Sequence, residues 1–127
     1  LLQERSFGEL RGRAYAELHL DPYAPGYEPP GGESWEAFHA RVDRAWERVQ
    51  AVAAETRGDL AVVTHGLVCR SLASRHLALP EGAELAACRW PNTSLTRVEG
   101  PAPWRAALLD CAAHLAGLEP EEAGSAV

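Results

Sequence analysis

What this sequence lacks excludes several common protein classes. Its 127 residues contain no methionine and only three cysteines. Cys69, Cys88 and Cys111 are odd in number and widely spaced, which fits reduced thiols in a cytoplasmic protein better than a disulfide framework. The five histidines form no His-x-x-x-His pattern and no Cys-x-x-Cys occurs, so no metal site is predicted.

Charge and hydropathy argue against two kinds of partner. The formal net charge is -6 and no basic stripe is present, so a nucleic-acid partner is not expected. No apolar run approaches the roughly 20 residues of a membrane span, and no basic-then-apolar leader occurs, so neither a membrane nor secretion is indicated. A small phosphorylated substrate stays compatible with this charge, because it needs only a local positive pocket. At 127 residues, the chain holds one domain at most.

The most informative stretch is Leu60-Ala-Val-Val-Thr-His-Gly66. Its apolar run predicts a short strand buried on both faces, and the near-helical spacing of apolar residues from Leu67 to Leu77 predicts a helix directly after it. His65 would then lie between a strand end and a helix N-terminus, where α/β sheets bind ligands and backbone N–H groups favour phosphate. A lone histidine there is more often an ordinary polar residue than a catalyst, so its companions decide between the two interpretations.

Two elements are predicted for the first third of the chain. The spacing of Leu10, Ala14 and Leu18 predicts a helix that begins at Glu9. Residues 21–33 contain four prolines and three glycines, so they form neither a helix nor a central strand. They are expected to form a surface loop that is long enough to suspect a function.

The longest helix is expected to begin after an N-cap at Ser34 and to run to about Thr56. Its apolar side chains recur at helical spacing and form one stripe: Phe38, Val42, Ala45, Trp46, Val49, Val52 and Ala53. His39 lies beside this stripe and is interpreted as a helix-surface residue rather than a ligand.

The last third alternates shorter elements. Strands are predicted over 90–99 and 104–109, a short helix over 111–118 and a frayed tail over 119–127. The complete order is helix, loop, long helix, strand, helix, strand, strand and short helix. This order indicates an α/β protein.

Four segments carry a family resemblance. They are Leu2-Gln-Glu-Arg-Ser-Phe-Gly8, Pro29-Pro-Gly-Gly-Glu-Ser34, Val62-Val-Thr-His-Gly66 and Asn92-Thr-Ser-Leu-Thr96. In the same order, they resemble the L-x-E-R-x-F/Y-G, P-x-G-E-S, V-V-S/T-H-G and N-x-S segments of the histidine phosphatase superfamily. The ending Asp110-Cys-Ala-Ala-His-Leu115 is similar to that of its small phosphatase members. The resemblance implies a three-layer α/β/α phosphoglycerate-mutase-like sheet, with residues 1–127 forming a single, partial domain of this type.

The resemblance also implies roles for particular residues. A first histidine of the family attacks the phosphoryl group, while the equivalent of His65 stabilises its oxygens by hydrogen bonding. The equivalent of Glu4 protonates the leaving oxygen and then activates water. Arg5 would lie near the substrate entrance, and Gly66 would let the backbone approach the phosphate. No metal or other cofactor is required. Without the resemblance, Glu4 and Arg5 would be interpreted as a solvated charge pair at a chain terminus.

The sequence departs from the family in two respects, because the segment that carries a second phosphate-clamping arginine is absent as well as the Arg-His-Gly motif. The Arg-His-Gly motif, which carries the nucleophilic histidine on the first strand, does not occur in it, and Arg75-His76 is followed by Leu77. With the missing methionine, this predicts an N-terminally truncated sheet: a fragment, a processed product or a truncated gene model. An apolar strand edge would then be uncovered, which predicts poor stability or self-association, with a homodimer as one outcome.

Three hypotheses follow for function. The first is a phosphoric monoester hydrolase of the histidine phosphatase type, of which this chain alone would be inactive. The second is a non-catalytic relative that binds a small phosphorylated substrate or inorganic phosphate. The third, an unrelated α/β binding module, is the weakest because it leaves the ordered segments unexplained. A phosphoglycerate-mutase-type phosphotransferase is disfavoured against a phosphatase by the short proline-rich loop.

Overall fold

The computed structural model describes residues 1–117 of the chain. These residues form two α-helices, α1 (Trp35–Glu55) and α2 (Gly66–His76), and two strands, β1 (Leu95–Glu99) and β2 (Arg105–Cys111). Four short 3-10 turns complete them: η1 (Gly8–Leu10), η2 (Tyr15–Glu17), η3 (Leu85–Ala87) and η4 (Ala113–Leu115). This mixed content is compatible with the predicted α/β class. The tail expected over 119–127 lies outside the described residues.

Helix α1 has the bounds that the sequence predicts. Ser34 is its N-cap, and the Ser34 hydroxyl accepts a hydrogen bond from the Ala37 N–H at 3.1 Å, which satisfies one free donor of the first turn. The C-cap is Thr56. The predicted stripe is also confirmed at its centre, where Phe38, Val42, Ala45 and Trp46 are buried.

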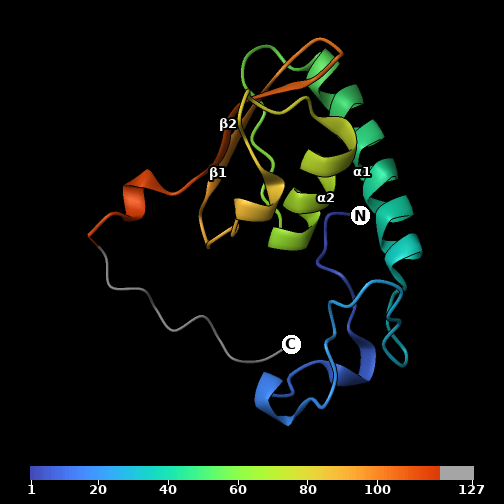
Figure 1. The fold of residues 1–127 in the computed structure, drawn as a ribbon. Helices are drawn as coiled ribbons and strands as arrows, with labels where there is room; N and C mark the ends of the chain where they lie inside the picture. Colours follow the sequence, from blue (N-terminus) through green and yellow to red (C-terminus); the bar gives the residue numbers. More distant parts are fainter. Residues whose placement is uncertain (118–127) are drawn as a thin grey trace.

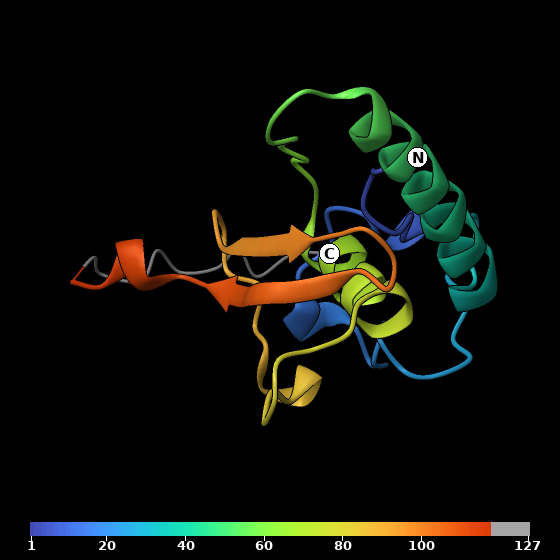
Figure 2. The same cartoon turned by 90° about the horizontal axis from the view of Figure 1, so that it is seen from above.

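The hydrophobic core lies where α1 packs against α2. Phe38 and Val42 of α1 meet Val68 of α2, and all three side chains are fully buried. Partly buried apolar side chains surround them: Leu2, Trp35, Leu67 and Leu72. Because Leu2 is among these, the N-terminal segment packs against both helices. In both views α2 lies between α1 and the strands (Figures 1 and 2).

The two strands form an antiparallel hairpin. Leu95 pairs with Cys111 at one end and Glu99 with Arg105 at the other. Trp104, directly before β2, connects the hairpin to α1. Its indole N–H donates to the Gln50 side-chain oxygen at 2.8 Å, and its ring packs edge-on against the Trp46 ring with the centroids 5.5 Å apart. The strand predicted over 90–99 is confirmed for its second half, 95–99, and the strand predicted over 104–109 is confirmed from Arg105 onward.

The buried strand predicted between α1 and α2 is wrong. Residues 60–64 belong to no strand or helix, and Val63 is 92% exposed. A strand requires a neighbour to accept its backbone hydrogen bonds, and within residues 1–117 none lies beside this segment. The two strands of the hairpin pair with each other, and β2 makes an isolated parallel bridge through Arg105 to Ala78. The apolar pattern of residues 60–64 is typical of a buried strand, but it gives no information on whether a neighbouring strand is available.

Two predicted helices are also wrong. Instead of a helix from Glu9, the chain forms η1 and η2, because Gly8 and Gly12 have φ angles of 52° and 82° that interrupt right-handed helix geometry. Instead of a helix from Cys111, β2 continues to Cys111 and only the short turn η4 follows. The pairing of Cys111 with Leu95 lengthens the ladder, and this non-local contact overrides a weak helical pattern.

Candidate functional site

The Glu4 carboxylate lies against the first turn of α2. One of its oxygens accepts the Leu67 N–H at 3.2 Å, from a residue 63 positions further along the chain. The other oxygen accepts the Arg5 N–H at 3.0 Å. A carboxylate is favourable here, because the first N–H groups of a helix lack partners and carry partial positive charge. The structure therefore brings the predicted acid–base residue to the start of the predicted helix.

His65 is the N-cap residue of this same helix. Its backbone is extended, with φ −112° and ψ 163°, and its carbonyl accepts the Cys69 N–H at 2.9 Å. The exposed side chain makes no capping hydrogen bond, and within residues 1–117 the ring has no hydrogen-bond partner. The preceding Thr64 hydroxyl donates to the Leu2 carbonyl at 2.7 Å. This bond joins the segment that carries His65 to the segment that carries Glu4.

Gly66 is the first residue of α2 and lies close to Trp90. A Cβ atom at position 66 would lie 3.4 Å from the Trp90 Cβ and 3.7 Å from the Trp90 carbonyl oxygen. Trp90 itself is held at a φ of 52°, and its N–H donates to the Asp110 carboxylate at 3.0 Å. The residues before β1 therefore come close to the start of α2, although a Cβ atom at position 66 would make only ordinary van der Waals contacts there.

Arg5, for which the family resemblance implies a place near the substrate entrance, is buried among backbone carbonyls of the proline-rich loop. Its side chain is 2% exposed, and its guanidinium donates to three backbone carbonyls, of Pro22, Tyr27 and Glu33. It also lies 4.0 Å from the centroid of the Trp35 ring. Burial lowers the pKa of the guanidinium, and the nearby Glu33 carboxylate partly offsets this effect. In this geometry Arg5 holds the 21–33 loop against α1.

Arg41 and Glu33 form a clamp that the sequence analysis did not identify. The Arg41 guanidinium pairs with the Glu33 carboxylate at 2.7 Å and donates to the carbonyls of Leu1, Gln3 and Glu4. The hydrogen bond from Arg41 lowers the pKa of Glu33, so this carboxylate stays ionised. A signal was present, because Arg41 follows the buried Phe38 by three positions and so borders the buried face of the helix. The clamp fixes the backbone that presents Glu4.

Cys69 in the second turn of α2 reports the electrostatics of the site. Burial raises the pKa of its thiol, and the carboxylates of Glu4 and Asp110 raise it further. A thiol with a raised pKa stays protonated at neutral pH and is therefore a poor nucleophile.

Among residues 1–117, no group of three or more His, Cys, Asp or Glu side chains is arranged to hold a metal ion. Helices long and apolar enough to cross a membrane are likewise absent from this described part.

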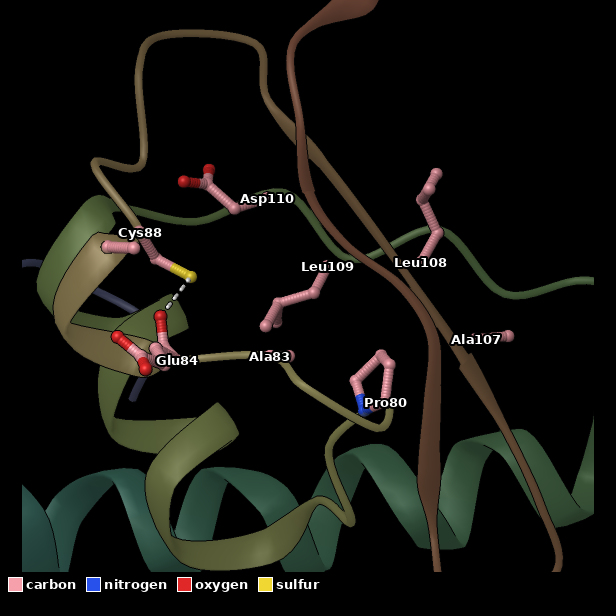
Figure 3. A pocket seen from close by; sticks show the side chains of 9 residues that line it. Pro80, Ala83, Glu84, Cys88, Ala107, Leu108, Leu109 and Asp110 are labelled. Atoms are coloured by element: carbon pink, nitrogen blue, oxygen red, sulfur yellow. Dashed lines mark hydrogen bonds between the residues drawn. The ribbon is translucent and has the colours of Figure 1, made fainter.

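Two hollows open on the surface of the described residues. One of about 430 Å³ lies between η3 and β2 (Figure 3), and its rim includes the carboxyl groups of Glu84 and Asp110. The other, of about 600 Å³, extends from the 21–33 loop along α2. It is lined by Tyr23, Pro25, Gly26, Trp35, His39, Leu67, Arg70, Ser71 and Ser74. This second lining contains one arginine and no carboxylate, so it suits an anionic ligand better than the first.

The start of α2 thus gathers a carboxylate, an unpaired imidazole and backbone N–H groups, which together suit a phosphoryl group. A family model described as "Histidine phosphatase superfamily (branch 1)" matches residues 1–103. The chain therefore belongs to the histidine phosphatase superfamily. This superfamily includes phosphatases and mutases, which act on phosphorylated compounds. No curated protein and no solved structure matches the chain.

Proposed function

We propose that this chain carries part of the active site of a phosphoric monoester hydrolase of the histidine phosphatase type. The observation that carries the proposal is the hydrogen bond between the Glu4 carboxylate and the Leu67 N–H, which brings Glu4 to the helix that His65 caps. Family membership supports the reaction class, and the position of both residues at the start of α2 supports their roles.

The two residues divide the chemistry of hydrolysis. A nucleophilic histidine forms an N–P bond as the P–O bond to the leaving group breaks. Protonated Glu4 gives its proton to the leaving oxygen, and His65 donates hydrogen bonds to the phosphoryl oxygens as their charge develops. In the second step, the Glu4 carboxylate takes a proton from water, the water oxygen attacks phosphorus and the N–P bond breaks. Phosphate and the free histidine are regenerated, and no metal or cofactor is needed.

The nucleophile belongs, in this proposal, to a strand that pairs with residues 60–64. Leu60 and Val62 are 38% and 39% exposed, and Val63 is 92% exposed, although the pattern of this segment is that of a buried strand. A strand beside it would cover these side chains and satisfy the backbone of this segment. It would also place a histidine at its own carboxyl end close to His65. The three-layer α/β/α arrangement is part of the same proposal.

The proposed role of Gly66 has more structural support than the proposed role of Arg5. Gly66 gives close access to the backbone at the start of α2, which suits contact with a phosphate oxygen. Direct contact between Arg5 and a substrate stays a prediction, because its guanidinium is committed to loop carbonyls. The geometry favours an indirect role, in which Arg5 orders the 21–33 loop beside the site.

Titration of the 127-residue chain with inorganic phosphate tests this proposal. We expect saturable phosphate binding that His65→Ala weakens by about ten- to hundredfold, since a hydrogen bond to a charged group contributes about 1.5–3 kcal/mol. His19→Ala is the matched control, because His19 is also exposed and has no hydrogen-bond partner in the described part of the chain. Binding that is insensitive to His65→Ala would contradict the proposed site.

A phosphate-binding protein without catalytic activity is the second candidate. It is favoured by the absence of Arg-His-Gly from the 127 residues. The two candidates differ in one measurement on the native gene product. A covalent phosphohistidine trapped during turnover supports the hydrolase, whereas phosphate binding without turnover supports the second candidate. Isomerisation of a phosphorylated substrate that is faster than its hydrolysis would indicate a mutase instead.

A further inference from the structure

The hollow beside α2 shares a residue with the candidate site. Leu67 lines the hollow, and its backbone N–H donates a hydrogen bond to the Glu4 carboxylate. The α2 residues in the lining, Leu67, Arg70, Ser71 and Ser74, follow the i, i+3, i+4, i+7 spacing of one helix face. The hollow therefore runs along α2 away from the turn where His65 and Glu4 lie.

The walls of the hollow are mostly apolar or aromatic. The 21–33 loop contributes Tyr23 and Pro25, and α1 contributes Trp35. These walls are well supported, because the Trp35 indole N–H donates to the Ala24 carbonyl at 3.0 Å and its ring stacks on His39 at 5.8 Å. A hollow of about 600 Å³ with such walls has the size and lining of a site for a small organic group.

The floor of the hollow is polar and fixed. The His39 Nδ1 atom and the Ser71 hydroxyl lie 2.8 Å apart, and Ser71 is 2% exposed. Burial lowers the pKa of the His39 imidazole, and Arg75 lowers it further, so His39 is neutral at neutral pH. The floor therefore contributes no charge, and Arg70 is the charged residue of the lining.

Arg70 differs from the arginines that maintain the fold. Arg41 and Arg75 are paired with carboxylates, and Arg5 with carbonyls. Arg70 is exposed at the hollow, and within residues 1–117 it has neither a salt bridge nor a hydrogen bond. It follows Leu67 by three positions, which is a rise of about 4.5 Å along the helix axis. An anion bound there would lie roughly one helix turn from the phosphoryl site.

We propose that this hollow is the subsite for the leaving group of the substrate, and that it selects phosphomonoesters whose apolar or aromatic leaving group carries a second anionic group for Arg70. This inference rests on the proposed function, because it places the phosphoryl group at His65. It adds the substrate class and names Arg70 as a specificity-determining residue. The hollow between η3 and β2 is a poorer choice, because Glu84 and Asp110 on its rim repel a dianionic ligand.

Two aryl phosphates that differ by one carboxylate test the proposal. Phenyl phosphate and 4-carboxyphenyl phosphate are titrated calorimetrically into the 127-residue chain at one ionic strength, because salt screens exposed charges. We expect the carboxylated compound to bind about tenfold more tightly, which corresponds to about 1.4 kcal/mol. Arg70→Gln should abolish this preference, whereas Arg44→Gln should retain it, since Arg44 is exposed on α1 and has no partner in the described part of the chain.

The remaining outcomes separate this inference from the proposed function. His65→Ala should weaken both compounds equally and leave their ratio unchanged. If His65→Ala has no effect while the Arg70-dependent preference persists, the phosphoryl site is wrong and the anion subsite stands. Equal binding of both compounds by the unmodified chain, a preference that survives Arg70→Gln, or no binding of either compound would overturn the inference. Amide shifts in an NMR titration confined to residues 83–88 and 107–110 would also overturn it, because they would place the ligand in the other hollow.

Discussion

The Glu4 carboxylate and the Leu67 N–H are joined by a hydrogen bond of 3.2 Å between the N-terminal segment and the first turn of α2. This bond places the Glu4 carboxylate at the start of the helix that His65 caps. It also explains why a short, irregular segment at the start of the chain has a defined position. The proposed chemistry of Glu4 therefore depends on a contact that also holds the N-terminal segment in place.

Replacement of this carboxylate gives the first prediction. In a form of the protein that contains the nucleophilic histidine, Glu4→Gln should lower turnover about 10²- to 10⁴-fold, because an amide cannot transfer the proton. Phosphate affinity should change little, since the amide oxygen can still accept the Leu67 N–H. Steady-state kinetics and phosphate titration measure the two effects separately. Glu9→Gln, at an exposed position, is the control, and an unchanged rate in Glu4→Gln would remove Glu4 from the site.

The Arg41 clamp gives the second prediction. Arg41→Met should release the backbone of residues 1–4, because it removes the hydrogen bonds to three of their carbonyls. Loss of charged hydrogen bonds costs about 2 kcal/mol, which would make opening of this segment roughly thirtyfold more frequent. Amide hydrogen exchange of residues 2–5 measures this opening. Arg48→Met, at an exposed position of α1, should leave the exchange unchanged, and equal exchange in both variants would contradict the clamp.

The contact between Gly8 and the proline-rich loop gives the third prediction. Gly8 has a φ of 52°, and a Cβ atom there would lie 2.1 Å from the Pro30 carbonyl oxygen. Gly12 has a φ of 82° but no atom within 4 Å of such a Cβ. Gly12→Ala should therefore cost only the left-handed backbone, about 1–2 kcal/mol, whereas Gly8→Ala should cost upward of about 3 kcal/mol because the loop must also move. Denaturant unfolding compares them, and equal losses would show that the crowding has no energetic consequence.

The ion pairs of Asp43 give the fourth prediction. Hydrogen bonds from Arg75 lower the pKa of Asp43 to about 2, and a further bond from His76 contributes to this shift. The pKa of Asp43 is lower in the folded chain than the roughly 3.9 of an unfolded aspartate. Above about pH 4, the ionised Asp43 carboxylate therefore stabilises the fold. The stabilisation is lost as the pH falls from about 4 to about 2. Partial exposure limits it to less than ~1 kcal/mol.

Melting temperatures from pH 7 to pH 2 measure this effect. Asp43→Asn should lower the melting temperature by a constant amount above about pH 5, and the difference from the unmodified chain should shrink to a small fraction of that amount at about pH 2. Asp59→Asn is the control, since Asp59 is exposed and has no partner in the described part of the chain. A difference that stays constant to pH 2 would show that the charge of Asp43 is not responsible.

The exposed segment before α2 gives the fifth prediction. Val63 is 92% exposed and its segment belongs to no strand or helix, which leaves a surface that can pair with a second copy of the chain. We expect concentration-dependent self-association in sedimentation velocity, and Val63→Lys should shift the chain toward monomer. Leu20→Lys, at a residue that is 44% exposed outside this segment, should have little effect. Association that Val63→Lys leaves unchanged would place the contact elsewhere.

Several features were determined by local sequence. Ser34 and the apolar stripe that contains Phe38 and Val42 were sufficient to predict α1, because capping and helical periodicity depend on residues within a few positions of one another. The prolines and glycines of 21–33 predicted a loop for the same reason. The segments around Glu4 and His65 indicated a shared site through family resemblance, and the structure brings both to the start of α2.

Only the tertiary structure decided how distant residues are partnered. It buried Arg5 among loop carbonyls, introduced Arg41 as the clamp of the N-terminal segment and left residues 60–64 without a strand neighbour in the described chain. Local sequence indicates whether a side chain is apolar or charged, but it does not identify the hydrogen-bond partners, which come from positions tens of residues away. A long amphipathic helix such as α1 satisfies its own backbone and can be predicted locally, whereas the strand predicted at 60–64 and the charged side chains of Arg5 and Arg41 depend on neighbours that only the fold supplies.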